Sequence, residues 1–148
     1  MTCAFCEIIA GERPAHIVLD DALAVAFLDA RPVFKGHLLL APRSHVETLM
    51  DLPGPQLGPF FTAAQRLARA MEDGLGAAGS FVAINNRVSQ SVPHLHVHVV
   101  PRNRKDGLRG FFWPRTRYVS DEEAAGYAGR IREALAGSSP AAAGDQAP

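Results

Sequence analysis

Three histidines stand at alternate positions of an otherwise apolar run, as His94, His96 and His98. Because successive side chains of an extended strand point to opposite faces, the three imidazoles share one face and aliphatic side chains occupy the other. Each imidazole has two ring nitrogens that need partners and an ordinary pKa near neutrality, so a core strand does not normally place three of them together. The pattern indicates a reaction centre or a metal site. The alternative is that the histidines serve only the fold, either as ligands of a structural metal ion or as half-buried residues with satisfied hydrogen bonds.

Two cysteines, Cys3 and Cys6, lie near the start of the chain with two residues between them. They are too close together to cross-link distant parts of a fold, so a structural disulfide is not expected. The same spacing lets two thiolates of one turn reach a single tetrahedral metal ion. The pair therefore favours a metal site, and the alternative is that both thiols are reduced and unligated.

Hydrophobic periodicity predicts the elements that must position these residues. Apolar residues at spacings of three and four over residues 54–76 predict an amphipathic helix. Ser120 and the three acidic residues after it predict the start of a second helix, which runs to about Leu135. Hairpins followed by a long helix favour an α+β domain, with an antiparallel sheet of about five strands and both helices packed on it. The five predicted strands cover residues 16–19, 22–28, 37–41, 81–85 and 93–100.

The composition agrees with one globular domain. The chain has 148 residues, 47% of them hydrophobic, and its 15 basic residues balance its 15 acidic ones. This length suits a single domain over residues 1–136, and residues 137–148, rich in Ala, Gly, Ser and Pro, are expected to be disordered. Without a basic stripe the chain is not expected to be a dedicated nucleic-acid binder, although a small nucleotide is compatible with it. With no apolar run of 18 residues and no signal-peptide pattern, we expect a cytoplasmic protein without a membrane partner.

The histidine strand, with Gln90 and Ser91 before it and Pro101 and Arg102 after it, resembles the signature of the histidine triad (HIT) superfamily of nucleotidyl hydrolases and transferases. The resemblance covers roughly residues 3–114, and it implies a HIT-like fold. The other segments that match in type and order are 3–9 (CAFCEII), 27–29 (FLD), 36–38 (GHL), 42–45 (PRSH) and 85–86 (NN).

The resemblance implies a role for each residue of the motif. His96 matches the nucleophile that forms a nucleotidyl-histidine intermediate, and the backbone carbonyl of His94 would fix its tautomer. This agrees with imidazole chemistry, because a ring that attacks phosphorus through one nitrogen needs its other nitrogen held as a donor. His98 would donate to the phosphate oxygens and help the leaving group depart, together with Gln90 and Ser91.

The implied activity is hydrolysis at the α-phosphate of purine nucleotide conjugates, either nucleoside phosphoramidates or dinucleoside polyphosphates such as diadenosine tetraphosphate. No organic cofactor is expected. One alternative is a phosphorolytic transferase that uses the same intermediate. Another is a nucleotide-binding interaction module with little turnover, against which the complete set of triad residues argues. Removal of adenylate from DNA ends would require extra basic surface or an added zinc finger.

Relatives also imply a structural zinc ion held by Cys3, Cys6, His45 and His94, which would anchor the histidine strand without touching substrate. His37 matches a fourth active-site histidine that supports the nucleophile. The alternative for His37 is an ordinary hydrogen-bonded core residue.

Contacts to the nucleoside also follow from the resemblance. Asp29 matches an acid that accepts hydrogen bonds from both ribose hydroxyls, although an acid at this place in a turn is also an ordinary turn residue. Asn85 matches a phosphate-contacting asparagine, and Asn86 could take that part instead. Four apolar residues could wall a purine pocket or belong to the core: Phe5, Ile8, Phe27 and Leu38.

The sequence departs from the family pattern in two segments. The loop over residues 85–90 is about two residues shorter than usual, lacks the glycine before Gln90, and brings in Arg87, which either holds an extra phosphate or is simply solvated. The later segment 110–115 is rich in aromatic residues, which suggests burial against a partner chain. Trp113 could reach the active site of the other subunit of a homodimer, or pack on its own core.

Overall fold

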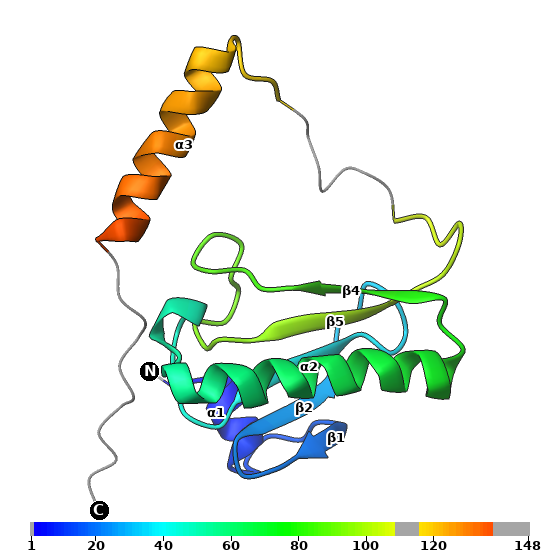
Figure 1. Cartoon of the computed structure of the whole chain (residues 1–148). Helices are drawn as coiled ribbons and strands as arrows, with labels where there is room; N and C mark the ends of the chain where they lie inside the picture. Colours follow the sequence, from blue (N-terminus) through cyan, green and yellow to red (C-terminus); the bar gives the residue numbers. More distant parts are fainter. Residues whose placement is uncertain (1, 109–115, 138–148) are drawn as a thin grey trace, which may run out of the picture. The chain divides into compact units, whose positions relative to one another are not determined.

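The computed structural model describes residues 2–108 and 116–137 (Figure 1). The chain divides into two compact units, the first ending at Arg104 and the second beginning at Lys105, and each is described here by itself. The single domain over residues 1–136 stays a prediction. Trp113 and the tail over residues 138–148 lie outside the described residues.

Five strands form one antiparallel sheet in the first unit, in the order β1-β2-β3-β5-β4. The sheet confirms the α+β class and the five strands predicted from the sequence. The strands are β1 (Ile17–Asp20), β2 (Ala24–Leu28), β3 (Leu38–Pro42), β4 (Gly79–Ala83) and β5 (Val97–Arg102).

The strand that carries the histidines begins later than predicted. β5 starts at Val97, so only His98 of the three histidines lies within its ladder, opposite Leu39 of β3. The preceding residues leave the sheet, because Leu95 N–H donates to the carbonyl of Val46 at 2.7 Å instead of pairing with β3. This departure from the ladder frees His94 to point away from the other two histidines.

One face of the sheet is covered by α2 (Gly54–Leu75), which confirms the predicted long helix. Its buried stripe recurs at spacings of three and four and packs on alternate residues of β2, β3 and β5. The helix ends at Gly76, whose φ of 68° is the left-handed conformation that glycine adopts without strain. The buried residues of the stripe are Phe60, Ala63, Ala64, Leu67 and Met71.

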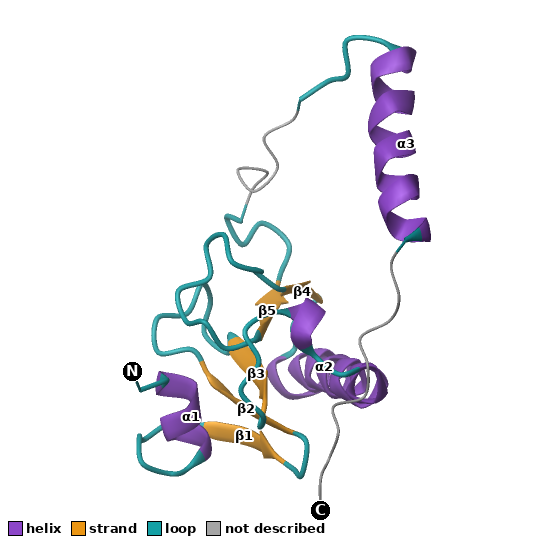
Figure 2. Ribbon diagram, turned by 90° about the vertical axis from the view of Figure 1, so that its left-hand side faces the viewer, coloured by secondary structure: helices purple, strands orange, loops and turns teal. Residues whose placement is uncertain are grey.

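The opposite face carries the short helix α1 (Ala4–Ile9), so the sheet lies between α1 and α2 (Figure 2). Phe5 is the buried residue of α1, and it packs on the side chains of β2 and β3 that alternate with those beneath α2. His98 is on this same face, because its ladder partners are Leu39 and Ala83. The α1 face therefore holds both the N-terminal cysteines and the histidines.

The second unit contains α3 (Asp121–Ala136), which confirms the helix predicted after Ser120. Its N-terminus is capped because the Ser120 hydroxyl oxygen accepts from Glu123 N–H at 3.1 Å. The predicted packing of this helix on the sheet stays a prediction. In the part of the chain that the structure describes, no helix is both long enough and apolar enough to cross a membrane.

Candidate active site and metal centre

His96 is buried and held by a backbone group. Its Nδ1 lies 2.7 Å from the carbonyl oxygen of His94, and its side chain is only 4% exposed. A carbonyl oxygen can only accept, so Nδ1 carries the proton of the neutral ring and Nε2 retains its lone pair. This is the arrangement that a nucleophilic imidazole requires.

His98 lies beside His96 and is paired with His37. The ring centroids of His96 and His98 are 5.0 Å apart, and His37 Nε2 is 3.0 Å from His98 Nδ1. His37 was expected to support the nucleophile, which stays a prediction; its ring contacts His98, the neighbour of His96. The other ring nitrogen of His37, Nδ1, accepts from Val33 N–H at 3.1 Å.

The environment keeps these rings neutral. Burial lowers the pKa of His96 and of His37 from the ordinary value of 6.5. Burial also lowers the pKa of His98, to about 4, and the charges that His96 and His37 would carry add to this effect. Asp29 has the opposite influence on all three rings, but burial outweighs it.

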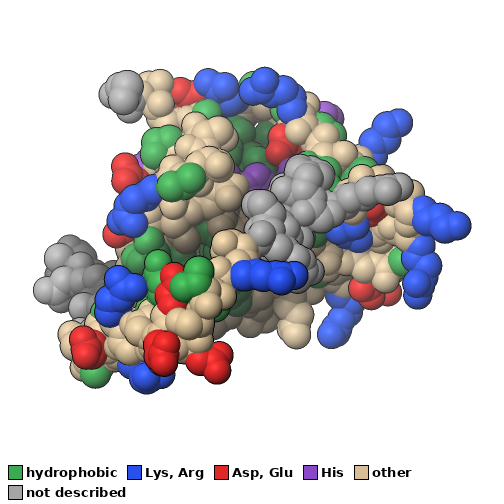
Figure 3. Space-filling model, turned by 90° about the horizontal axis from the view of Figure 1, so that it is seen from above, with side chains coloured by type: hydrophobic (Ala, Val, Ile, Leu, Met, Phe, Trp, Pro, Cys, Tyr) green, Lys and Arg blue, Asp and Glu red, His purple; other side chains and the backbone are tan. Residues whose placement is uncertain are grey.

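The apolar residues proposed for a purine pocket fall on both faces of the sheet. Phe5 meets the His96 ring edge to face at a centroid distance of 5.0 Å, and it also contacts Phe27 at 5.3 Å. Ile8 packs on the same cluster. Leu38 packs in the core beneath α2, on the other face of the sheet. Seen from above in Figure 3, histidine atoms (purple) lie recessed between apolar side chains (green) and others (tan).

Asp29 combines a turn contact with a position at the site. Its Oδ1 accepts from Arg31 N–H at 2.9 Å, as expected of a turn residue. Its Oδ2 lies 3.7 Å from His37 Nε2, and the side chain is 22% exposed. One carboxylate oxygen is thus used by the turn, and the other faces the histidines.

The loop over residues 85–90 is held by side-chain amides. Asn86 Oδ1 accepts from Leu49 N–H at 2.9 Å, at the start of the single-turn helix η1 (Leu49–Asp51). Gln90 Oε1 accepts from Arg87 N–H at 2.7 Å, and Gln90 Nε2 donates to the carbonyl of Glu47 at 2.6 Å. Within the described residues, no hydrogen bond is seen for the Asn85 side chain. The Asn86 side-chain oxygen is thus used within the fold, and phosphate binding by Asn85 stays a prediction.

The shortened loop adopts unusual backbone angles at residues other than glycine. Arg87 has a φ of 68° and Ser89 a φ of 60°, both in the left-handed region. The pKa of Asp51 is lowered first by hydrogen bonds from Thr48, and the charge of Arg87 adds to this effect, which places Arg87 near Asp51. Ser91 is exposed at the end of the loop. The tight loop thus replaces the glycine of the family pattern with strained residues.

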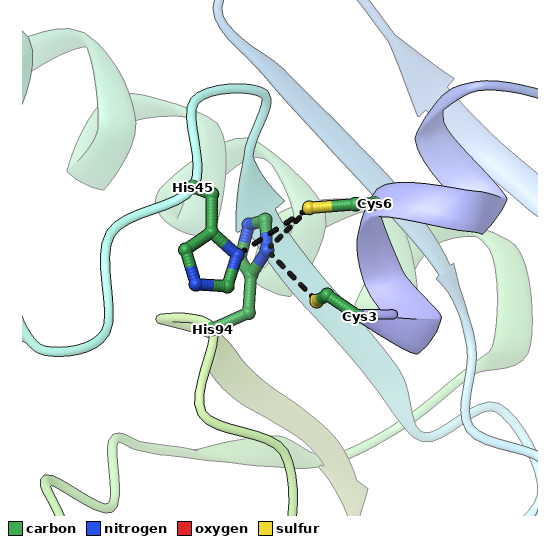
Figure 4. A group of neighbouring side chains, drawn as sticks. All are labelled: Cys3, Cys6, His45 and His94. Carbon is green, nitrogen blue, oxygen red and sulfur yellow. Dashed lines mark hydrogen bonds between the residues drawn. The ribbon is translucent and has the colours of Figure 1, made fainter. Parts of the chain in front are cut away.

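The two cysteines and two further histidines converge at a second centre, on the α1 side of His96. Four potential ligand atoms, from Cys3, Cys6, His45 and His94, lie within 4.8 Å of one another. Figure 4 shows the two sulfur atoms at α1 facing the rings of His45 and His94. His94 Nδ1 is 3.5 Å from the Cys3 sulfur, and His45 Nδ1 is 3.4 Å from the Cys6 sulfur.

This cluster fits a tetrahedral metal ion. Thiolate and imidazole are the donors that zinc prefers. His94 Nε2 donates to the carbonyl of Pro42 at 2.8 Å, so the Nδ1 that faces the thiols carries the lone pair. The pKa of Cys6 is raised by burial and by the neighbouring Cys3 thiol, and a bound cation would relieve the repulsion between two thiolates. The four residues predicted from the sequence therefore lie close together. The hydrogen bond to Pro42 also fixes the tautomer of His94 that a metal ion requires.

Three backbone groups that hold the histidine rings could not be predicted from residue types. The carbonyls of His94 and Pro42 and the N–H of Val33 each hold one ring nitrogen of a histidine. The His94 carbonyl was expected from the family resemblance. The other two are backbone groups on loops or strand ends, and every residue has such groups, so the sequence carries no signal for them.

Comparison with known proteins agrees with this geometry. The HIT domain family matches residues 10–105. An uncharacterized HIT-like protein of Mycobacterium tuberculosis is 39% identical over 138 residues, which covers 92% of this chain and 94% of that protein. An adenosine 5'-monophosphoramidase of Schizosaccharomyces pombe is 31% identical over 125 residues, covering 83% of this chain and 90% of that protein.

A similar solved structure is that of a zinc-bound histidine triad family protein from Mycobacterium smegmatis. The two structures align with a TM-score of 0.70 and 34% identity, over 92% of this chain and 98% of that chain. The family match spans more than half of the chain, and it includes the three histidines and the loop before them. The chain therefore belongs to the HIT domain family.

Proposed function

We propose that this protein hydrolyses purine nucleotide conjugates at the α-phosphate through a nucleotidyl-His96 intermediate. The observation that carries the proposal is the 2.7 Å hydrogen bond from His96 Nδ1 to the His94 carbonyl, which leaves a lone pair on Nε2 of a neutral ring. The S. pombe relative, which is named as an adenosine 5'-monophosphoramidase, supports this class of substrate.

The reaction has two displacements at phosphorus. First, His96 Nε2 attacks the α-phosphorus and forms a P–N bond while the bond to the leaving group breaks; His98 donates a hydrogen bond that stabilises the developing charge, and an amine leaving group takes its proton from solvent. Water then attacks the same phosphorus and gives up one proton to solvent, the P–N bond breaks, and a nucleoside monophosphate is released. The leaving group is an amine for a phosphoramidate and a nucleotide for a dinucleoside polyphosphate.

The remaining residues would bind the substrate. We assign the ribose hydroxyls to the Asp29 carboxylate, a phosphate oxygen to Asn85, and contacts near the leaving group to Ser91. Phe5 is placed to contact the base, since it already lies against the His96 ring. Gln90 reaches the phosphates only if its amide exchanges one of its two loop hydrogen bonds for a substrate contact.

We also propose that Cys3, Cys6, His45 and His94 hold a structural zinc ion. The donor set and the fixed tautomer of His94 support this assignment, as does the zinc-bound M. smegmatis relative. The ion would cross-link α1, the segment after β3 and the segment before β5. Its role is to anchor these segments, and no chemical step passes through it.

Two further properties expected from the sequence stay predictions. The protein is proposed to act in the cytoplasm and to form a homodimer in which Trp113 approaches the other subunit. Light scattering of the purified protein tests the dimer, and a stable monomer would contradict it.

A turnover assay tests the proposed reaction. An adenosine phosphoramidate and diadenosine tetraphosphate are compared with and without inorganic phosphate, and the products are identified. We expect the hydrolysis product with at least one substrate, and a loss of about a thousandfold or more in kcat for His96→Asn. His16→Asn, which changes an exposed histidine outside the site, is the matched control. Failure of both substrates with full metal content would favour the binding module, and a product carrying added phosphate would favour phosphorolysis.

A further inference from the structure

We propose that the backbone N–H of Val33 fixes the tautomer of His98 through His37, so that His98 presents an Nε2–H donor to the reacting phosphate. Val33 and His37 are then positioning residues, because neither needs to touch the substrate. The inference rests on the proposed function for its catalytic meaning, but the tautomers themselves can be measured independently.

The first step is the hydrogen bond between Val33 and His37. The Val33 nitrogen lies 3.1 Å from His37 Nδ1. A backbone N–H can only donate, so Nδ1 must present its lone pair. His37 is only 3% exposed, and burial favours its neutral form. The one proton of the neutral ring is therefore on Nε2.

The second step is the contact between the two rings. His37 Nε2 is 3.0 Å from His98 Nδ1, which is a hydrogen-bond distance. Since His37 Nε2 carries the proton, it donates the hydrogen bond and His98 Nδ1 accepts that bond with its lone pair. His98 Nδ1 is therefore unprotonated. The proton of neutral His98 is therefore on Nε2, at the far side of the ring from His37.

The turn that holds Val33 is itself fixed by hydrogen bonds. Asp29 N–H donates to the carbonyl of His37 at 2.9 Å, and His37 N–H donates to the carbonyl of Phe34 at 3.0 Å. Arg31 N–H donates to Asp29 Oδ1 at 2.9 Å. The Asp29 carboxylate is the charged group that faces His37, but its Oδ2 is 3.7 Å from Nε2, farther than His98 Nδ1. The proton on His37 Nε2 is thus directed to His98.

The result is a complementary pair of neutral rings. His96 has its proton on Nδ1 and its lone pair on Nε2, whereas His98 has the reverse. One ring can attack phosphorus while its neighbour, with a centroid 5.0 Å away, donates a hydrogen bond to the phosphate oxygens or the leaving group. The two tautomers are set by two different backbone groups, the carbonyl of His94 for His96 and the N–H of Val33, through His37, for His98.

The ring tautomers also distinguish the two groups of residues that could hold a metal ion. Asp29, His37 and His98 also offer ligand atoms within 4.8 Å of one another. A metal on His37 Nε2 would force the proton of the ring onto Nδ1, where it would meet the Val33 N–H. In contrast, His94 already presents the lone pair of Nδ1 to the two cysteines. The tautomers therefore direct a metal to the cysteine cluster and away from the active-site histidines.

Nitrogen-15 NMR of the histidine rings, in the full chain carrying its metal, tests this relay. Long-range correlations distinguish a ring protonated on Nδ1 from one protonated on Nε2. We expect the Nε2–H form for His37 and His98 and the Nδ1–H form for His96. In His37→Leu, His98 should lose its fixed tautomer and kcat should fall about tenfold to a hundredfold. His37→Gln retains an N–H donor, so it should preserve the Nε2–H form of His98 and more turnover than His37→Leu.

The outcomes separate this inference from the proposed function. A wild-type His98 protonated on Nδ1, or a His98 tautomer that is unchanged in His37→Leu, would overturn the relay even if His96 forms an adduct. The expected tautomers without any adduct at His96 would contradict the proposed function and leave the relay intact. The wild-type spectrum decides the first point even if His37→Leu does not fold. The His96 signals, held by a different backbone group, are the internal control in both variants.

Discussion

At the scale of single residues, the chemistry of this site depends on which nitrogen of each ring carries the proton. Hydrogen bonds to three backbone groups fix the tautomers of His94, His96 and His37. The hydrogen bond from His37 then fixes the tautomer of His98. Residue types and their alternate spacing identified the histidines, but the expectation that all three share one strand face was wrong, because β5 begins only at Val97 and the His94 ring faces Cys3. The family resemblance implied the His94 carbonyl, but the Pro42 carbonyl and the Val33 N–H could not be predicted, since they depend on how loops fold onto the strand.

A prediction at this scale concerns pH. Because burial lowers the pKa of His98 to about 4, this ring should stay neutral well below the ordinary value of 6.5. The catalytic rate should be level near pH 7 and fall only on the acid side, below the ordinary histidine pKa. A profile of kcat against pH checks this. An acid limb centred at or above 6.5 would contradict it, and a variant at exposed His16 is the control.

The free energy of unfolding should also decrease as the pH falls. In the unfolded chain a histidine binds a proton below about 6.5, whereas folded His98 binds one only near 4. Between these values the unfolded state holds more protons, so the free energy of unfolding decreases as the pH falls, by at most about 1.4 kcal/mol per pH unit for one such histidine. Urea unfolding over this range measures the slope. His98→Gln should reduce the slope, and an unchanged slope would contradict the assignment.

At the scale of elements, the turn before β3 has a strict requirement for glycine. Gly36 has a φ of 98°, and a Cβ added there would lie 2.6 Å from Leu75 Cδ1 of α2. The backbone angle disfavours a side chain, whereas the Leu75 side chain is 60% exposed and its end can move away from an added Cβ. Because His37 follows directly, this turn also places the ring that contacts His98.

We expect Gly36→Ala to lower the free energy of unfolding by about 1–3 kcal/mol, as is typical for strain at a special backbone angle. Chemical denaturation measures the change. Gly74→Ala is the matched control, because this position lies in α2 with open space around its Cβ, and alanine there should be neutral or stabilising by up to about 1 kcal/mol. Equal effects of the two substitutions would contradict the argument.

Most elements could be predicted from the sequence, because each has a clear period. The stripe of α2 repeats at three and four residues, and Ser120 with its acidic neighbours marks the start of α3. The start of β5 could not be predicted. The apolar run continues back to residue 93, but Leu95 pairs with Val46, a contact 49 positions away that local periodicity does not encode.

At the scale of the whole molecule, two centres share one residue in the first unit. The side chain of His94 faces the cysteines, and its carbonyl holds His96. A metal at the cysteine cluster would therefore fix the carbonyl that sets the nucleophile, without contact with substrate. Cys3 and Cys6 are 91 and 88 positions from His94, so the fold is needed to show that they meet.

A prediction at this scale is that the protein carries about one zinc ion per chain when it is purified without added metal. Cys6→Ser should lose most of the metal and lower the melting temperature, because three segments lose their common anchor. Elemental analysis and thermal unfolding measure these changes. Glu7→Gln, next to Cys6 but outside the cluster, is the control. A folded wild-type protein with a zinc content near zero would remove the metal centre from the account.

The most direct test of the central claim is to trap the intermediate on His96. The protein is mixed with an adenosine phosphoramidate or diadenosine tetraphosphate, quenched during turnover, and digested for mass spectrometry. We predict an adenylate adduct on the peptide that contains His96, which is absent from His96→Asn and retained in His16→Asn. Turnover without any adduct, or undiminished turnover by His96→Asn, would contradict the proposed mechanism.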